Sequence, residues 1–313
     1  MPGLRGVWAP ALLGVRSSLG RMASPTSPVL AALDRDGAPA LVDPSAPLLR
    51  ADDLAVLRGE GVFETMRAYG GRAFLLQEHL ERMVGSAARV GVTLPSADAL
   101  GRLATCALDD FGPGDGSLRL VVSKGPDGAG GGVAYALASP VAAASVQARE
   151  RGVRAATLSL GTPADMRASS PWLLGGVKST SYAGAMAALR AASDAGAGDA
   201  IYLSGDGEVL EAPTAAVVAV VDGTPVTPPE DAVGILPSTT AGFFGASLTR
   251  RRLRQDELRA ASEVLLLSSV RGVVSVLEID GRAVGTGEIG PRGRAMRDAY
   301  ESAVRGMADE IAR

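Results

Sequence analysis

The segment Trp172-Leu173-Leu174-Gly175-Gly176-Val177-Lys178-Ser179-Thr180-Ser181-Tyr182 places a rare lysine in apolar surroundings. The chain has 31 basic residues, of which only Lys124 and Lys178 are lysines. Because a guanidinium is not deprotonated in a protein, arginine cannot act as an amine nucleophile or form a Schiff base. Desolvation lowers the pKa of a lysine toward neutrality, which makes Lys178 the candidate for a reactive amine. A lysine that snorkels from the end of a strand gives the same pattern, whereas Lys124, in a turn composition, indicates an ordinary solvated charge.

Composition limits the classes of protein that this chain can belong to. With 313 residues and 47% hydrophobic residues it is long enough for two domains with a substantial core. Its net charge of −3 gives no electrostatic attraction to nucleic acid or to an anionic membrane, and no apolar run reaches the length of a membrane span. A single cysteine, Cys106, excludes an internal disulfide framework and fits a reducing, cytoplasmic location. Because His79 is the only histidine, we expect no metal site unless it meets Cys106.

The first 27 residues differ from the rest of the chain. They contain three arginines and no acidic residue, and a short apolar run at 9–15 is followed by no clear small-x-small cleavage site. We predict that residues 1–27 are a disordered extension, and a targeting peptide is the alternative.

From Pro28 onward, turn residues separate short apolar runs, and other segments repeat apolar residues every three or four positions. The predicted hairpins lie at 29–42, 61–76, 118–138, 201–211 and 217–227, and further strands at 153–160, 264–268 and 273–279. The predicted helices cover 76–90, 97–111, 182–195, 237–252 and 296–311. No helix follows the glycine-rich residues 125–132, so a hairpin loop is favoured over a phosphate cradle there.

Small residues at 138–145 suggest a linker near residue 142. We therefore predict an α+β protein with a smaller domain at 28–141 and a larger one at 142–313. The run of arginines between Arg250 and Arg259 is broken by Asp256 and Glu257, and it is typical of a solvated helix end rather than a nucleic-acid patch.

Three further features can be combined with Lys178. Glu211 lies in an apolar run, where a buried carboxylate needs a cation; a protonated pyridine nitrogen is suitable, and a water-facing strand edge is the alternative. Ser238-Thr239-Thr240 at a predicted helix start offers amide groups and hydroxyls to a phosphate, although Ser and Thr are also ordinary N-cap residues. Ser269 at a strand end can add a hydroxyl to the same anion.

A Schiff-base lysine, a carboxylate for a ring nitrogen and a phosphate site are the parts of a pyridoxal phosphate site. The chain resembles the class IV, branched-chain-aminotransferase-like pyridoxal phosphate enzymes over roughly residues 28–310. Six segments carry the resemblance through their order and spacing: Arg58-Gly-Glu-Gly-Val-Phe-Glu-Thr65, Glu78-His-Leu-Glu-Arg-Met83, Ser117-Leu-Arg-Leu-Val121, Lys178-Ser-Thr-Ser-Tyr182, Gly207-Glu-Val-Leu-Glu211 and Gly234-Ile-Leu-Pro-Ser-Thr-Thr240.

The resemblance implies a two-domain fold of the D-amino-acid-aminotransferase-like kind, a homodimer, and a cofactor held by the larger domain. It also implies roles for nine residues: Lys178 binds the cofactor as a Schiff base, Glu211 pairs with the pyridine nitrogen, Tyr182 reaches the phenolic oxygen, Arg82, Thr239, Thr240 and Ser269 hold the phosphate, and Arg58 and Arg119 face the substrate.

The phosphate site has two further features in the sequence. Helical periodicity alone predicts that Arg82 is exposed to solvent, on a polar face with His79 and Ser86, and His79 is expected to be structural. The chain has Ala241 and Ser238 where the family commonly has Arg and Gly, so its phosphate loop departs from the family pattern at these two positions.

Within this family the chain most resembles the aminodeoxychorismate lyases, which implies the conversion of 4-amino-4-deoxychorismate to 4-aminobenzoate and pyruvate in folate biosynthesis. Residues 124–132 lack the Arg-x-His pair that is typical of D-amino-acid transaminases. The longer glycine-containing segment that follows the lysine in branched-chain aminotransferases is also absent. An aminotransferase of either kind is the alternative, and a non-catalytic binding homologue is the second alternative.

Overall fold

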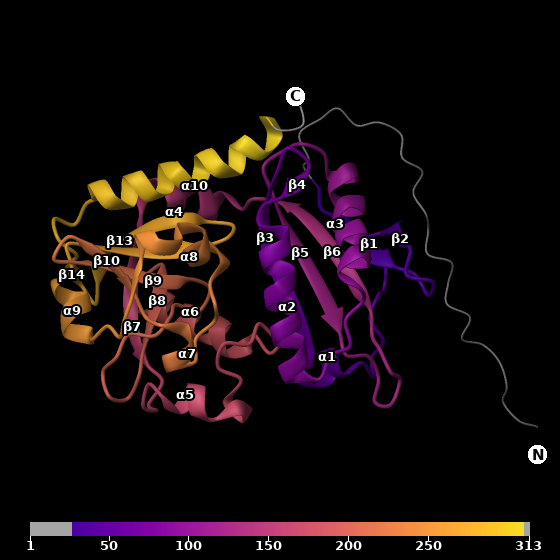
Figure 1. The fold of residues 1–313 in the computed structure, drawn as a ribbon, viewed down its shortest axis with the longest axis horizontal. Coiled ribbons are helices and arrows are strands. Elements are labelled where there is room, and N and C mark those ends of the chain that lie inside the picture. Colours follow the sequence, from indigo (N-terminus) through magenta and orange to yellow (C-terminus); the bar gives the residue numbers. More distant parts are fainter. Residues whose placement is uncertain (1–26, 310–313) are drawn as a thin grey trace, which may run out of the picture.

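The computed structural model describes residues 27–309, so the predicted extension lies outside the described residues except for Ser27. Within residues 27–309 the strands form two sheets, and helices pack beside both of them (Figure 1). The predicted α+β class is confirmed. None of the helices in this part of the chain is long and apolar enough to cross a membrane.

The first sheet has the strand order β2-β1-β6-β5-β3-β4, and each pairing is antiparallel. Its strands are β1 (Val29–Leu33), β2 (Pro39–Val42), β3 (Gly61–Tyr69), β4 (Arg72–Ala73), β5 (Gly116–Ser123) and β6 (Ala134–Pro140). The short helix α1 (Leu54–Arg58) precedes β3, and α2 (Leu76–Val90) and α3 (Ala97–Phe111) follow β4. Met66, Leu103 and Leu118 lie in the core between these two longer helices and the sheet, where each is completely buried.

The second sheet has the order β11-β10-β9-β12-β13-β7-β8, with β14 beside β13. Its strands are β7 (Val153–Ser159), β8 (Asp199–Leu203), β9 (Ala216–Val221), β10 (Thr224–Thr227), β11 (Thr249–Arg250), β12 (Glu263–Ser268), β13 (Gly272–Ile279) and β14 (Arg282–Ala283). The sheet is mixed, because β13–β7, β7–β8 and β10–β11 are parallel and the other pairs are antiparallel.

Helices pack around this second sheet. They are α4 (Ala143–Arg151), α5 (Met166–Ser169), α6 (Ala183–Asp194), α7 (Glu230–Val233), α8 (Thr239–Phe244), α9 (Gln255–Ala260) and α10 (Pro291–Asp309), with 3₁₀ turns at Pro171–Leu173 and Gly245–Ser247. The long helix α10 contacts β12 and β13 and reaches β3 of the first sheet (Figure 1).

Most of the predicted elements are confirmed, but the predicted long helix at 237–252 is wrong. The helix expected at 237–252 ends at Phe244, because Gly245 adopts φ +48° and the chain leaves the helical conformation there. At the predicted linker near residue 142, β6 ends at Pro140 and α4 begins at Ala143, so only residues 141–142 lie outside secondary structure. The strands of the first sheet precede residue 142 and those of the second follow it; the division into domains at this residue stays a prediction.

The Lys178 segment joins the two sheets by backbone hydrogen bonds to the start of β3. The Phe63 amide donates to the Lys178 carbonyl at 3.2 Å, and the Thr180 amide donates to the Gly61 carbonyl at 2.9 Å. This close approach requires glycine at position 59, where a Cβ would lie 2.2 Å from the Ser181 Oγ. Gly59 also has φ +71°, a conformation that L-residues rarely adopt.

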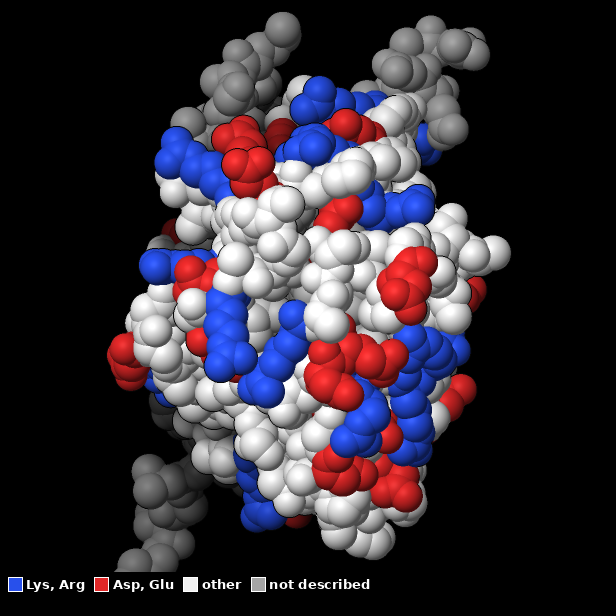
Figure 2. Space-filling model, turned by 90° about the vertical axis from the view of Figure 1, so that its left-hand side faces the viewer, with Lys and Arg blue, Asp and Glu red and all other residues white. Residues whose placement is uncertain are grey.

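The arginines after α8 are paired with carboxylates. Arg250 pairs with Glu230, Arg251 with Glu257, and Arg252 with Glu208. Figure 2 shows the side of the molecule that carries α9, where positive and negative side chains are intermixed. The charges on this face therefore neutralise one another locally.

We expect Gly59→Ala to destabilise the protein more than Gly71→Ala. Both glycines have nearly the same positive φ (+71° and +73°), but no atom lies within 4 Å of a Cβ built at Gly71. The φ strain of about 1–2 kcal/mol is common to both variants, and the contact with Ser181 adds overpacking of about 1–3 kcal/mol in Gly59→Ala. Urea denaturation of the two variants measures the difference. Equal midpoints would contradict the tight docking of the Lys178 segment.

Candidate active site

A cavity of about 1280 Å³ lies between the two sheets and is lined by residues of both. Eight of the nine predicted site residues line it: Arg82, Arg119, Lys178, Tyr182, Glu211, Thr239, Thr240 and Ser269. Arg58 does not: it is exposed at the end of α1 and is not among the residues that line the cavity. The cavity is larger than an ordinary small-ligand pocket of about 300–1,000 Å³, so it has room for a cofactor and a substrate together.

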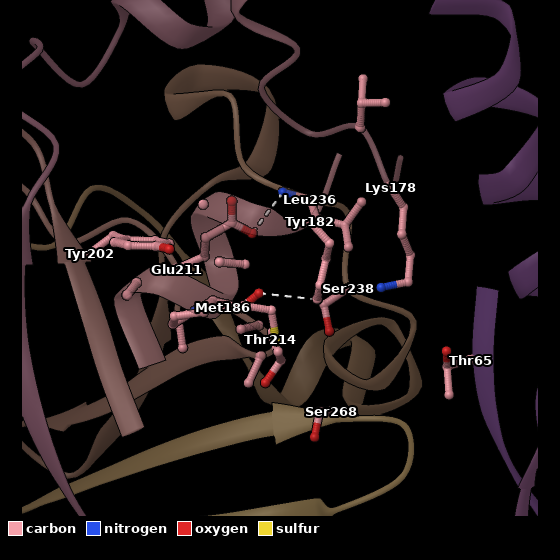
Figure 3. A pocket seen from close by; sticks show the side chains of 18 of the residues that line it. Thr65, Lys178, Tyr182, Met186, Tyr202, Glu211, Thr214, Leu236, Ser238 and Ser268 are labelled. Carbon is pink, nitrogen blue, oxygen red and sulfur yellow. Dashed lines mark hydrogen bonds between the residues drawn. The ribbon is translucent and has the colours of Figure 1, made fainter. Parts of the chain in front are cut away.

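Lys178 directs its amine into this cavity (Figure 3). The nitrogen lies 4.3 Å from the centroid of the Phe63 ring and 5.7 Å from that of Tyr182. The Ser86 hydroxyl holds the backbone in place, since it accepts a hydrogen bond from the Lys178 amide at 3.1 Å. Burial lowers the pKa of Lys178 to about 8, although Glu64 and Glu211 favour the charged form. The amine therefore loses its proton far more readily than an exposed lysine, and it becomes mostly neutral as the pH rises above about 8.

Glu211 lies on the other side of the cavity in the same view, with Tyr182 between it and Lys178 (Figure 3). Its Oε2 accepts a hydrogen bond from the Leu236 amide at 3.1 Å, and its Oε1 lies 3.4 Å from the Arg167 guanidinium. Burial raises the pKa of Glu211, and Arg167 opposes this effect. A cation in the cavity would stabilise the carboxylate further, and a protonated ring nitrogen is the cation expected from the sequence.

Tyr182 presents an uncharged phenol to the cavity. Its hydroxyl donates to the Pro213 carbonyl at 3.2 Å, and its ring packs edge-to-face on Phe63 with the centroids 5.1 Å apart. Burial raises the pKa of Tyr182 above its ordinary value, so the phenol keeps its proton and serves as a hydrogen-bond donor.

Arg82, Thr239 and Ser269 gather at one end of the cavity. Arg82 uses three N–H groups within the protein: two bind the Glu64 carboxylate at 2.8 and 2.6 Å, and one binds the Pro237 carbonyl at 2.8 Å. A guanidinium has five donors, so donors remain for an anion. The Thr239 and Ser269 hydroxyl oxygens lie 3.3 Å apart.

The environment of Arg82 corrects the prediction from helical periodicity. Its side chain is only 10% exposed, and His79 and Ser86 beside it are buried. The polar face of α2 is covered by segments that precede α6 and α8, because Ser86 contacts Lys178 and Arg82 contacts Pro237. Two faces of this helix are therefore buried, one apolar and one polar.

These residues fit pyridoxal 5′-phosphate, as three observations show. Arg82 keeps two unused N–H groups at the same end of the cavity as the Thr239 and Ser269 hydroxyls, which provides donors for a phosphate. A lysine amine with a lowered pKa lies where an aldehyde can reach it. A carboxylate with a raised pKa lies across the cavity, where a pyridinium would stabilise its charge.

Sequence reasoning did not find every functional side chain. Glu64 is completely buried in β3 and binds Arg82, and Arg167 of α5 binds Glu211. Glu64 lies within the Arg58–Thr65 motif, so its place in that motif could have identified it. Nothing local marks Arg167, because its partner is 44 residues away.

A cavity that combines an amine of lowered pKa, an opposing carboxylate and unused hydrogen-bond donors suits an enzyme that binds its cofactor through a lysine. The chain belongs to the class IV aminotransferases: the model of that family, described as Amino-transferase class IV, matches residues 61–279. Enzymes of this family depend on pyridoxal phosphate, which is therefore the cofactor of this chain, and they act on small molecules.

Known proteins support the same assignment. A relative from Mycobacterium tuberculosis named bifunctional aminodeoxychorismate lyase / D-amino acid transaminase is 38% identical over 258 residues, covering 77% of this chain and 89% of that protein. The PLP-bound form of a hypothetical aminotransferase from the same organism has a TM-score of 0.80 at 35% identity, covering 90% of this chain and 100% of its own. A fold IV-transaminase from Curtobacterium pusillum has a TM-score of 0.81 at 32% identity, covering 90% and 99%.

We expect Lys178→Arg to abolish turnover and the visible absorbance of the bound cofactor, because a guanidinium cannot form an imine. Lys124→Arg, a change at the other lysine of the chain, is the matched control and should keep both. Wild-type protein stripped of cofactor should take it up faster as the pH rises through about 8, where the Lys178 amine loses its proton. Normal turnover in Lys178→Arg would contradict the assignment.

We expect Glu211→Gln to bind the cofactor and to lower kcat by orders of magnitude. A neutral amide does not stabilise a pyridinium, so electron withdrawal from the substrate is weakened. Steady-state kinetics with saturating cofactor measure the effect. Glu278→Gln, in β13 and outside the cavity lining, is the control. A change in kcat of less than about threefold in Glu211→Gln would exclude the proposed role.

Proposed function

We propose that this protein is a 4-amino-4-deoxychorismate lyase, which forms 4-aminobenzoate and pyruvate in folate biosynthesis. The proposal rests on one observation above the others: the cavity holds the complete amine, carboxylate and anion set, while the loop between β5 and β6 contributes neither Arg nor His at 124–132. The name of the M. tuberculosis relative, which includes this activity, supports the same choice.

Each site residue has a proposed task. When bound, pyridoxal phosphate engages the substrate amine and draws electrons from the adjacent carbon. Lys178, as a neutral amine, removes the proton from the ring carbon that bears the amine. Glu211 would stabilise the positive charge of the protonated ring nitrogen of the cofactor. Tyr182 would turn its hydroxyl from the Pro213 carbonyl to the phenolic oxygen of the cofactor, and Arg82 would anchor the phosphate.

Arg119 is proposed to bind a substrate carboxylate. It projects from β5 into the cavity, where its guanidinium lies 5.2 Å from the Phe63 ring centroid and its Nε donates to the Thr65 hydroxyl at 3.3 Å. Only one of its N–H groups is used in this contact, so a forked pair remains available to a carboxylate. Arg58 remains a proposed substrate contact, although it does not line the cavity of this single chain. A homodimer and a cytoplasmic location are proposed from the family resemblance.

The lyase reaction needs no second substrate. The atoms of 4-amino-4-deoxychorismate equal those of 4-aminobenzoate and pyruvate together, so the proton taken by Lys178 is returned to the products. Formation of the aromatic ring makes the reaction strongly downhill. A transaminase, in contrast, needs a keto acid to restore its cofactor after each half-reaction.

An aminotransferase is the second candidate function. It is favoured by the D-amino acid transaminase activity in the name of the M. tuberculosis relative, and its chemistry uses the same lysine, carboxylate and anion site. The two activities differ in their need for a keto acid, which provides the test.

We expect purified protein to release 4-aminobenzoate and pyruvate from 4-amino-4-deoxychorismate for many turnovers per site without any keto acid. Product amounts in equal proportion, measured by chromatography and a coupled pyruvate assay, would support the lyase. Lys178→Arg is the inactive control. Turnover only with an amino acid and a keto acid would assign the protein as an aminotransferase. A chain without cofactor absorbance or turnover would be a binding homologue.

A further inference from the structure

The only histidine of the chain connects the buried carboxylate to the anion end of the cavity. His79 is completely buried on the polar face of α2. Its Nδ1 lies 2.6 Å from the Glu64 carboxylate. Its Nε2 lies 3.3 Å from the Thr239 hydroxyl and 3.2 Å from the Ser269 hydroxyl. The role proposed so far for the phosphate site does not use this imidazole.

The partners of His79 fix which nitrogen carries its first proton. Hydrogen bonds from Arg82 and His79 outweigh the effect of burial and lower the pKa of Glu64 to about 2, so Glu64 is an acceptor only. His79 Nδ1 must therefore donate to Glu64. The Arg82 nitrogen 3.3 Å from Nδ1 is also a donor, so that contact is no hydrogen bond. Nε2 is then a bare acceptor in the neutral ring and a donor in the charged ring.

The charge of the ring decides where the two hydroxyl hydrogens point. Nε2, the Thr239 Oγ1 and the Ser269 Oγ form a triangle with sides of 3.2 to 3.3 Å. With neutral His79, one hydroxyl must donate to Nε2, and at most one hydroxyl hydrogen is left for an anion. With charged His79, Nε2–H donates to the hydroxyl oxygens, and both hydroxyl hydrogens are free to point at an anion.

The protein itself disfavours the charged ring in the absence of an anion. Burial lowers the pKa of His79, and the positive charges of Arg82 on the same helix and Lys178 on the segment before α6 lower it further. Glu64 on β3 raises it. A dianionic group bound beside the Thr239 and Ser269 hydroxyls would lie close to Nε2. Its negative charge would raise the pKa of His79, and its oxygens would accept hydrogen bonds from the two hydroxyls.

We propose that His79 is a positioning residue that takes up a proton when the cofactor phosphate binds, and that its Nε2–H then turns the Thr239 and Ser269 hydroxyls toward the phosphate as donors. The proposal rests on the proposed phosphate site and does not depend on whether the enzyme is a lyase or an aminotransferase. By linkage, phosphate-like dianions bind more tightly as the pH falls through the titration of His79.

The single histidine makes the test direct, because full-length, tag-free protein gives one imidazole signal. Nitrogen-15 NMR of the ring distinguishes the Nδ1–H form from the imidazolium. The spectra are recorded on protein stripped of cofactor, on the same protein with sulfate, and on the protein loaded with pyridoxal phosphate. Sulfate remains a dianion near neutral pH, so it contributes no titration of its own. An opposite charge nearby should raise the His79 titration midpoint by about 1–3 pH units.

Variants at the two hydroxyls test the mechanism of coupling. Thr239→Val combined with Ser269→Ala should reduce the upward shift of the midpoint, whereas Ser268→Ala, at a neighbouring hydroxyl that makes no hydrogen bond to His79, should retain it. His79→Gln should bind sulfate with an affinity that no longer rises as the pH falls from about 7 to 5, a range that contains the ordinary His pKa and lies below the pKa of Lys178.

The outcomes separate this inference from the placement of the cofactor. If sulfate moves the His79 resonances but the ring stays in the Nδ1–H form, or if it is charged throughout, the inference is wrong and the phosphate site stands. If neither sulfate nor pyridoxal phosphate changes the resonances, the anion site has been placed wrongly and both proposals fail.

Discussion

The buried carboxylate of Glu64 is the constraint on which the arrangement of the site depends. It is completely enclosed in β3, and only the hydrogen bonds from Arg82 and His79 make its charge tolerable. Loss of one partner from such a buried pair costs about 3–5 kcal/mol. The carboxylate therefore fixes both α2 side chains in one orientation, with Arg82 directed at Pro237 and His79 at the two hydroxyls. The anion end of the cavity is organised by a carboxylate that does not itself line the cavity.

The reactive amine depends on a different contact between the sheets. Lys178 lies in a segment that precedes α6, but its backbone bonds to the start of β3 and to Ser86 of α2. Phe63, from the first sheet, lies under the amine and desolvates it together with Tyr182. Neither sheet alone would bury this nitrogen, so the lowered pKa is a property of the two docked together. Arg67 adds a second link, because it donates to the Val270 carbonyl next to Ser269.

The same site is suited to more than one reaction. The roles proposed for Lys178, Glu211 and the anion site are proton transfer, charge stabilisation and anchoring, and these tasks are common to lyases and aminotransferases. What separates the reactions is the substrate end, which here has Arg119 on β5 and a loop between β5 and β6 without Arg or His. In this proposal the choice of reaction depends on the cavity wall contributed by the first sheet, while cofactor binding depends on residues of both sheets.

The sequence by itself determined the local elements and the chemistry of single residues. Turn residues between short apolar runs located the hairpins, and the rarity of lysine singled out Lys178, because residue order and composition are enough to read both signals. Only the tertiary structure decided that Arg82 is covered, that Glu64 is buried with it, that Arg167 meets Glu211, and that Arg58 stays outside the cavity. Helical periodicity reports the one apolar face that packs on the adjoining sheet. A second, polar buried face arises from contacts between segments far apart in the chain, and no local pattern records those contacts.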